Sequence, residues 1–136
     1  MRNADVNMKR VFPYGVASPK PAIRIKPGLK MALNRNVLRS LGNPSHIQFW
    51  WEPSKKALLV GSAPPDALSS YKISDYCYTV KGNINIRSTT FINAIMSATK
   101  WHKNKTYAIL GDYIPELDMV AFRADDAVEM EVDVNA

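Results

Sequence analysis

Basic side chains crowd the first third of this chain, in numbers that suit the binding of a polyanion. Residues 1–39 hold nine Lys and Arg side chains against one acidic residue, whereas residues 125–136 hold five acidic side chains and no basic one. The formal net charge of the 136-residue chain is +6. A basic front end with an acidic tail is typical of polyanion binding, with the tail competing for the basic face. The plain alternative is that these Lys and Arg side chains are ordinary solvent-exposed surface residues with no ligand.

We expect seven basic residues to contact the phosphates of a nucleic acid, five early in the chain and two further along. They are Arg24, Lys26, Lys30, Arg35, Arg39, Lys81 and Arg87. Each phosphate contact releases condensed counterions, which makes such binding electrostatic and dependent on salt. Arg35 and Arg39 stand four residues apart, so they share one face of a short helix. Their guanidinium groups match the acceptors of guanine, so they are the best candidates to reach base edges, although a solvated helix face explains the pair as well.

No set of residues predicts catalysis, a metal site or a cofactor. His46 and His102 have no clustered partners at metal-ligand spacing. The six glycines are scattered rather than gathered into a phosphate loop, and the serines lack a nucleophile-elbow context. The acidic residues within 112–118 fit a turn better than a cation site. The single cysteine, Cys77, excludes an internal disulfide and fits a reducing compartment. We therefore expect a binding protein rather than an enzyme.

The elements that must position these side chains follow an order that occurs twice, offset by about 53 to 54 residues in its early part. The order is strand, short helix, strand, turn and strand. In the first copy we expect these elements at 29–33, 34–42, 46–52, 53–56 and 57–60, with a further strand at 22–26 before them. In the second copy we expect them at 82–86, 88–99, 106–110, 113–118 and 119–122. Each unit is too small to bury a core alone, so we expect the two to pack against each other.

Local signals support the first unit. Asn34 suits the N-cap of the helix because its side chain accepts a free backbone N–H, and Gly42 suits the left-handed position after the helix. In the strand 46–52 the alternation places Ile47, Phe49 and Trp51 on one face and Trp50 on the other. If the first set belongs to the core, Trp50 points outward and needs another surface to cover its ring. An oligomer interface is the expected cover, and base stacking is the alternative.

Composition divides the chain into a basic arm, two units, a linker and a tail. The divisions fall at 1–21, 22–63, 64–70, 71–124 and 125–136. The tail alternates weakly between apolar and acidic residues, which fits an edge strand or an unstructured end equally well. The first ten residues have no apolar run typical of a secretory signal, and no stretch approaches the length of a membrane span. We expect a cytoplasmic protein with no membrane partner.

The stretch 29–60 resembles the AbrB and MazE group of swapped-hairpin DNA-binding regulators. The residues Val37-Leu38-Arg39-Ser40-Leu41-Gly42 lie where that group carries Leu-Arg-Arg-x-Leu-Gly. Lys30 and Arg24 match basic positions of the group on its first two strands. Asn34 replaces the usual proline at the helix start. The resemblance implies an α+β, mostly β fold, in which two tandem strand-helix-strand-strand units form a swapped-hairpin-like barrel as a pseudo-dimer or a further oligomer.

The same resemblance implies a small DNA-binding transcriptional regulator, or an antitoxin-like protein that also grips a toxin. Such a protein contacts double-stranded DNA through a basic face of the first unit and is a homo-oligomer. The alternative is a structural or assembly protein that uses this fold for protein contacts without nucleic acid. DNA binding requires the basic side chains of the first unit to converge on one surface, whereas an assembly module scatters them and buries Trp50 between subunits.

Overall fold

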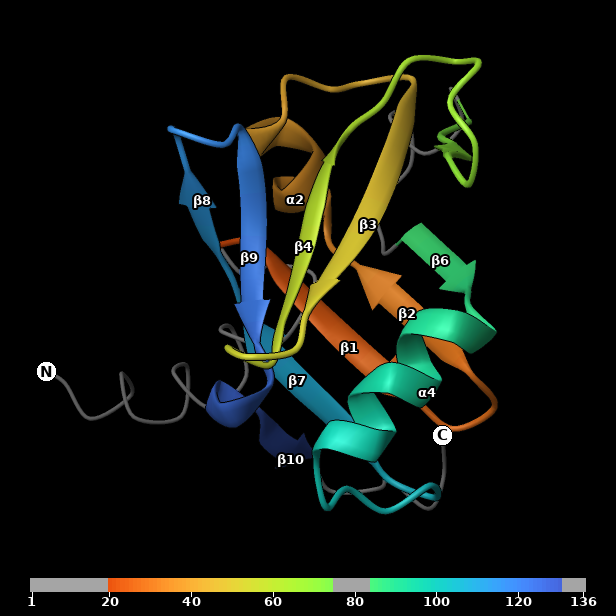
Figure 1. The fold of residues 1–136 in the computed structure, drawn as a ribbon, viewed down its shortest axis with the longest axis vertical. Helices are drawn as coiled ribbons and strands as arrows, with labels where there is room; N and C mark the ends of the chain where they lie inside the picture. Colours follow the sequence, from red (N-terminus) through yellow and green to blue (C-terminus); the bar gives the residue numbers. More distant parts are fainter. Residues whose placement is uncertain (1–19, 75–83, 131–136) are drawn as a thin grey trace, which may run out of the picture.

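Two five-stranded antiparallel sheets form most of the protein (Figure 1), in a computed structural model that describes residues 20–74 and 84–130. Sheet A has the order β10-β7-β1-β2-β6 and consists of β1 (Ala22–Lys26), β2 (Lys30–Leu33), β6 (Ile84–Arg87), β7 (Thr106–Leu110) and β10 (Val128–Met130). Sheet B has the order β5-β3-β4-β9-β8 and consists of β3 (His46–Glu52), β4 (Ala57–Ser62), β5 (Tyr71–Lys72), β8 (Asp112–Ile114) and β9 (Met119–Arg123). The fold is α+β and mostly β, as predicted, but the strands described here form two open sheets rather than a closed barrel.

Both sheets combine strands from the two repeated stretches of sequence. In sheet A, β2 pairs with β6 and β1 pairs with β7. In sheet B, β4 pairs with β9 and β3 pairs with β5. The first strand of each stretch therefore lies beside a later strand of the other, and neither stretch completes a sheet by itself.

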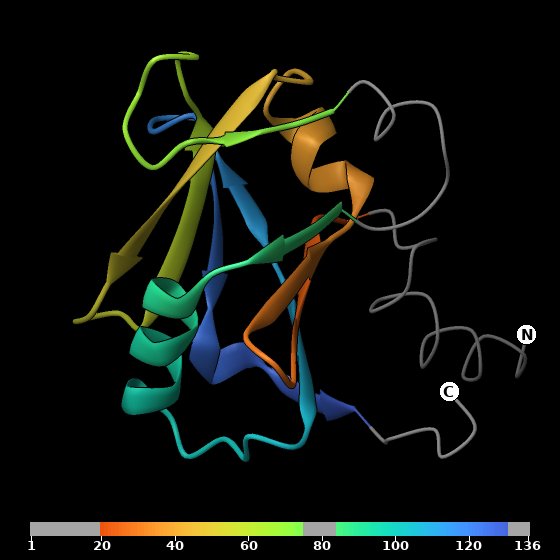
Figure 2. The ribbon, with the colours of Figure 1, turned by 90° about the vertical axis from the view of Figure 1, so that its right-hand side faces the viewer.

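The core lies between the two sheets and is shared by both stretches. Ile23 of β1 and Phe122 of β9 are fully buried in the same apolar cluster. The helices α2 (Arg35–Ser40) and α4 (Thr89–Ala98) lie at opposite ends of the molecule and add their apolar sides to this cluster (Figure 2). Because the inner faces of the sheets meet in the core, their outer faces point away from each other.

Side-chain caps hold both helices where the sequence predicted them. The Asn34 Oδ1 accepts a hydrogen bond from the Val37 backbone N–H at 3.3 Å, and the Ser88 Oγ accepts one from the Phe91 N–H at 3.3 Å. After α2, Gly42 has a φ of 80°, and its N–H donates to the Arg39 carbonyl at 3.1 Å. Glycine adopts this left-handed backbone at little cost, so it ends the helix cleanly.

One C-terminal segment differs from the expectation, and another matches one of its two alternatives. Residues 113–118 are not a single turn, because the short strand β8 occupies Asp112–Ile114 and pairs with β9. Gly111 makes this possible: a Cβ there would lie 2.6 Å from the buried ring of Phe122, so only glycine lets β7 lead so closely into β8. Of the acidic tail, the described part forms the 3-10 helix η2 (Ala124–Asp126) and then β10, an edge strand on β7. No helix within the described residues is long and apolar enough to cross a membrane.

Candidate nucleic-acid interface

The register of sheet A brings three of the predicted basic residues into one row. Lys26 of β1 lies directly opposite Lys30 of β2, and Lys30 lies directly opposite Arg87 of β6. Directly opposed residues of an antiparallel pair have Cβ atoms about 5 Å apart on the same face. Arg24 is two residues from Lys26 along β1, so it shares that face. We call Arg24, Lys26, Lys30 and Arg87 the basic face.

The basic face is the outer, solvent side of sheet A. The residues that alternate with it, among them Ile25 and Met31, are fully buried in the core. Lys30 and Arg87 are exposed, whereas Arg24 and Lys26 are half-buried. The alternation of the strands thus holds four cations on the side away from the core.

Small residues flank Arg24 on both sides of its strand. Arg24 lies opposite Ala32 of β2 and opposite Ala108 of β7, and both alanines are buried. Long cationic side chains cover such apolar neighbours with their stems while the charged head stays in water. Burial lowers the pKa of the Arg24 guanidinium. Burial also lowers the pKa of Lys26, and the positive charges of Arg24 and Lys30 lower it further.

No carboxylate neutralises these four cations within residues 20–74 and 84–130. The ion pairs of that part of the chain involve other basic residues, and the C-terminal carboxylates belong to them. The pairs are Lys20–Asp112, Lys56–Asp125, Lys105–Glu129 and Arg123–Asp126. The described carboxylates of the acidic tail therefore pair with other cations, although β10 itself forms the edge of sheet A.

A cavity lies at the end of the hairpin between β1 and β2, next to Lys26 of the basic face. It has a volume of about 220 Å³ and lies between the Pro27-Gly28 turn and α4, with Lys26 and Lys103 both lining it. The Ser88 N–H donates to the Leu29 carbonyl at 3.2 Å and so fixes the start of α4 beside this turn. Lys103 was missed from the sequence, because only the packing of α4 against the hairpin brings its loop to Lys26.

The remaining predicted residues lie elsewhere. Arg35 and Arg39 belong to α2, which follows the far end of β2, about 13 Å along the strand from Lys30. The Arg39 Nη1 donates to the Asn36 Oδ1 at 3.1 Å. Lys81 lies outside the described residues. The first unit's basic residues thus form a cluster on sheet A and a separate pair on α2.

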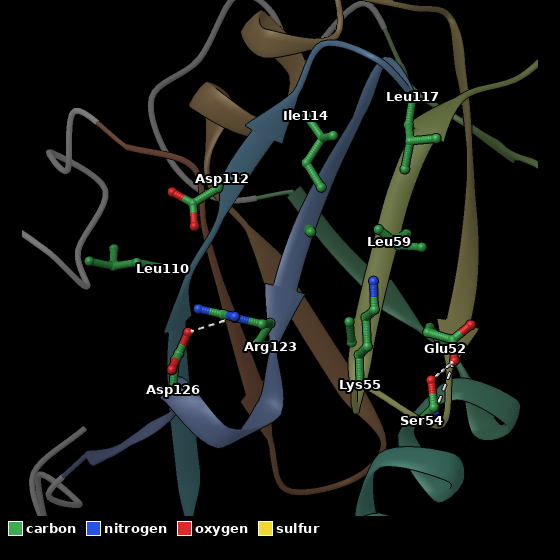
Figure 3. Close-up of a pocket in the computed structure, with 12 residues that line it drawn as sticks. Glu52, Ser54, Lys55, Leu59, Leu110, Asp112, Ile114, Leu117, Arg123 and Asp126 are labelled. Carbon is green, nitrogen blue, oxygen red and sulfur yellow. Dashed lines mark hydrogen bonds and ion pairs between the residues drawn. The ribbon is translucent and has the colours of Figure 1, made fainter.

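Trp50 lies on the other side of the molecule, on the outer face of sheet B, with 38% of its surface exposed. The alternation expected in β3 is confirmed, since Ile47 and Phe49 are buried in the core. Beside Trp50 this outer face contains a hollow of about 580 Å³ (Figure 3). Leu59 and Ala121 line the hollow, and charged residues stand on two sides of it.

Metal-binding chemistry has no support in the described residues, where no three His, Cys, Asp or Glu side chains gather. The His46 Nδ1 lies 2.9 Å from the hydroxyl of Ser45, its neighbour in sequence. A scan against protein-family models and searches of curated proteins and of solved structures found no match to this chain. The basic face is therefore defined by the register and charges of this chain alone.

Proposed function

We propose that this chain is a small DNA-binding protein whose basic face contacts the phosphates of a duplex. The observation that supports this most is the row of Lys26, Lys30 and Arg87, with Arg24 beside it and no carboxylate paired to any of them in the described residues. Like charges placed opposite each other destabilise a sheet, so an anion that neutralises them gains binding energy.

The shape of the site favours double-stranded nucleic acid. Lys26, Lys30 and Arg87 lie on three neighbouring strands about 4.8 Å apart, so their row spans about 10 Å across the face of sheet A. Long Lys and Arg side chains on such a face can reach several phosphates of one duplex. The outer face of sheet A has no aromatic residue in the rows through Arg24 and Lys30, and base stacking is what a single-strand binder requires.

The strand pairing supports a likeness to the swapped-hairpin regulators. Corresponding strands of the two units pair with each other, as β2 with β6 and β4 with β9. The first strand of each unit pairs with a later strand of the other, as β1 with β7 and β5 with β3. We therefore include in this proposal a pseudo-dimer of two swapped-hairpin-like units, and a role as a transcriptional regulator or an antitoxin-like protein.

The test is the binding of a labelled, mixed-sequence duplex, measured by fluorescence anisotropy at two salt concentrations. Each phosphate contact contributes about 0.9 to the slope of log affinity against log salt. We expect Lys30→Ala/Arg87→Ala to weaken binding and to reduce that slope by about 2. The matched control is Lys56→Ala/Lys72→Ala, which removes the same charge from the turn before β4 and from β5, away from the basic face, and should leave both quantities nearly unchanged.

A third double variant, Arg35→Ala/Arg39→Ala, separates the cluster on sheet A from the pair on α2. If only this variant loses affinity for the duplex, the DNA-binding site lies on α2 and not on the basic face. If wild-type protein does not bind the duplex even at low salt, the proposal fails, and the assembly alternative becomes the better explanation of the fold.

A further inference from the structure

The cavity at the end of the β1–β2 hairpin is lined by cations and by no acidic residue. Its walls come from the turn between the two strands and from α4, which passes beside that turn in Figure 1, with one lysine from the loop after α4. The side chains that shape it are those of Lys26, Leu29, Ile92, Asn93, Met96 and Lys103. Two of these are positively charged, so the cavity has a charge that its own walls do not balance.

No carboxylate elsewhere in residues 20–74 and 84–130 pairs with Lys26 or Lys103. The ion pairs of that part of the chain all involve other basic residues. Burial lowers the pKa of Lys26, and the neighbouring charges of Arg24 and Lys30 lower it further. A negative ligand at Lys26 would relieve this repulsion, so the electrostatics of the cavity favour an anion.

A third ammonium group lies close to the same turn. A Cβ at Gly28 would lie 3.8 Å from the Lys30 Cε, so the end of the Lys30 side chain lies beside Gly28, which itself lines the cavity. Lys30 is exposed and belongs to β2, whereas Lys26 belongs to β1 and Lys103 to the loop after α4. Three separate parts of the chain therefore supply positive charge around this one position.

Leu29 has a backbone conformation that leucine normally avoids. Its φ is 61°, in the left-handed region where bulky side chains are outliers, and the hydrogen bond from the Ser88 N–H to its carbonyl helps to hold it there. The Leu29 side chain lines the cavity together with Ile92 and Met96 of α4. Strained residues of this kind gather at ligand sites. Glycine at this position would remove the strain but also the apolar wall, so the leucine indicates that the wall has a use.

The volume of the cavity and the chemistry of its walls define the ligand. At about 220 Å³ it is smaller than the sites of drug-sized molecules, which measure about 300 to 1,000 Å³, so its occupant has few non-hydrogen atoms. Lysine ammonium groups act as point charges that suit phosphate oxygens, whereas a planar carboxylate is matched best by the fork of an arginine. The amide of Asn93 offers N–H donors for a further oxygen.

We propose that this cavity binds a phosphate monoester, whose phosphate group contacts Lys26 and Lys103. The carbon atoms next to the phosphate lie against Leu29, Ile92 and Met96. A monoester carries about two negative charges at neutral pH, whereas each phosphodiester of a DNA backbone carries one, so it gains more from a pair of lysines. Two sources supply such a group, namely a free phosphorylated small molecule and the 5′ end of a DNA strand.

The test is a titration of the full chain with phenyl phosphate, followed through the backbone amide signals in nuclear magnetic resonance. We expect the signals of Leu29, Asn93 and Lys103 to shift and to saturate, with a Kd of about 1 mM or lower. Phenol has the ring without the phosphate and should cause no saturating shift of these signals. Added salt should weaken the binding of phenyl phosphate, because it screens the charges.

Two variants outside the basic face separate the charge from the wall. Lys103→Gln should raise the Kd about fivefold or more, because it removes a charge-assisted contact. The matched control is Lys100→Gln, which removes a lysine of the same loop that does not line the cavity and should leave the Kd nearly unchanged. Leu29→Gly should also raise the Kd, while thermal unfolding stays close to that of wild type because backbone strain is relieved.

Fluorescence anisotropy with otherwise identical duplexes, with and without 5′-phosphates, distinguishes the two sources. Tighter binding of the phosphorylated duplex that is lost in Lys103→Gln identifies the strand end as the ligand. Equal binding of the two duplexes by a chain that binds phenyl phosphate identifies a free small molecule. Shifts that do not saturate with phenyl phosphate overturn the proposal, as does a Kd that both Lys103→Gln and Leu29→Gly leave unchanged. The titration contains no DNA, so its outcome is independent of the proposed function.

Discussion

Lys30 of β2 lies directly opposite Arg87 of β6, so two cations from distant parts of the chain are neighbours across one strand pair. Lys26 lies opposite Lys30 on the other side. Like charges in this arrangement cost a sheet roughly 0.2 to 1 kcal/mol for each pair. Selection for stability alone would disfavour this row of like charges, which is one reason to regard the row as a binding surface.

Replacement of Lys30 by Gln should therefore stabilise the protein while it weakens DNA binding. The expected gain is about 0.5 to 1 kcal/mol in the free energy of unfolding, because both like-charge contacts disappear. Urea denaturation at low salt measures this gain. The difference from wild type should shrink at high salt, which screens exposed charges. An equal gain at both salt concentrations would show that charge repulsion is not its cause.

Asn34 should be more important to stability than an ordinary helix cap. Its side chain is 2% exposed, and its Oδ1 accepts from the Ala22 N–H at 3.1 Å as well as from Val37. Its Nδ2 also donates to the Lys20 carbonyl at 2.8 Å, so one residue joins β1 to α2. We expect Asn34→Ala to cost about 2 to 3 kcal/mol, since it leaves buried backbone groups unpaired.

The matched control for that prediction is Ser88→Ala, which removes a cap that accepts only one N–H. Its expected cost is about 1 kcal/mol. Chemical denaturation of both variants gives the comparison. Equal costs for the two substitutions would mean that the contacts from Asn34 to β1 contribute little.

Gly111 should tolerate no side chain. A Cβ there would lie 2.6 Å and 2.8 Å from two ring carbons of Phe122, a residue that is fully buried. The ring has no free space to move into, so Gly111→Ala should destabilise by about 1 to 3 kcal/mol or more. Gly42→Ala is the comparison, because nothing lies within 4 Å of a Cβ there and its cost comes from a φ of 80° alone. Thermal unfolding ranks the two variants.

The attachment of β10 to β7 should depend on acid pH. Lys105 donates a hydrogen bond to the Glu129 Oε2 at 2.8 Å, and this contact lowers the pKa of Glu129 below its usual range. A carboxyl group with a lowered pKa in the folded chain stabilises it above the pKa of the unfolded chain. That contribution is lost as the pH falls through the folded value. Both side chains are exposed, so the effect should be local to β10 rather than global.

Nuclear magnetic resonance of the β10 amides as a function of pH is the measurement. In wild-type protein the amide signals of β10 should shift below about pH 4.5, while signals of the central strand β4 stay constant. In Glu129→Gln the same β10 signals should show no such acid transition. A transition that persists in this variant would assign the effect to another carboxylate.

The local features were readable from the sequence, whereas the contacts between distant strands were not. The helix-capping bonds of Asn34, Gly42 and Ser88 reach residues only three away, so these cap positions followed from residue type. The bonds from Asn34 to Lys20 and Ala22 connect distant segments and could not be read in the same way. The pairing of Lys26 with Lys30 also follows from one tight hairpin. The pairing of Lys30 with Arg87 depends on the register of two strands far apart in the chain, which no local pattern determines.

The same limit explains the other differences. Lys103 lies near Lys26 only because α4 packs beside the hairpin. The strand β8 has only three residues, too few for the alternation that reveals longer strands, and its presence depends on how Gly111 packs against Phe122. The hollow on sheet B arises from Ala57 and Ala121 on two paired strands, and each of them looks unremarkable in its own segment.

The pairing of β1 with β7 also constrains how the chain can be synthesised. Ala22 lies opposite Leu110, so one edge of β1 stays unpaired until β7 has been synthesised. Folding dominated by such distant pairing is slow and leaves unpaired edges that aggregate. A nascent chain that has emerged only as far as Ser74 contains β1 and β4 but lacks β7 and β9, the strands that pair with them. We therefore expect each half to aggregate when made alone, and the two halves to fold only when they are produced together.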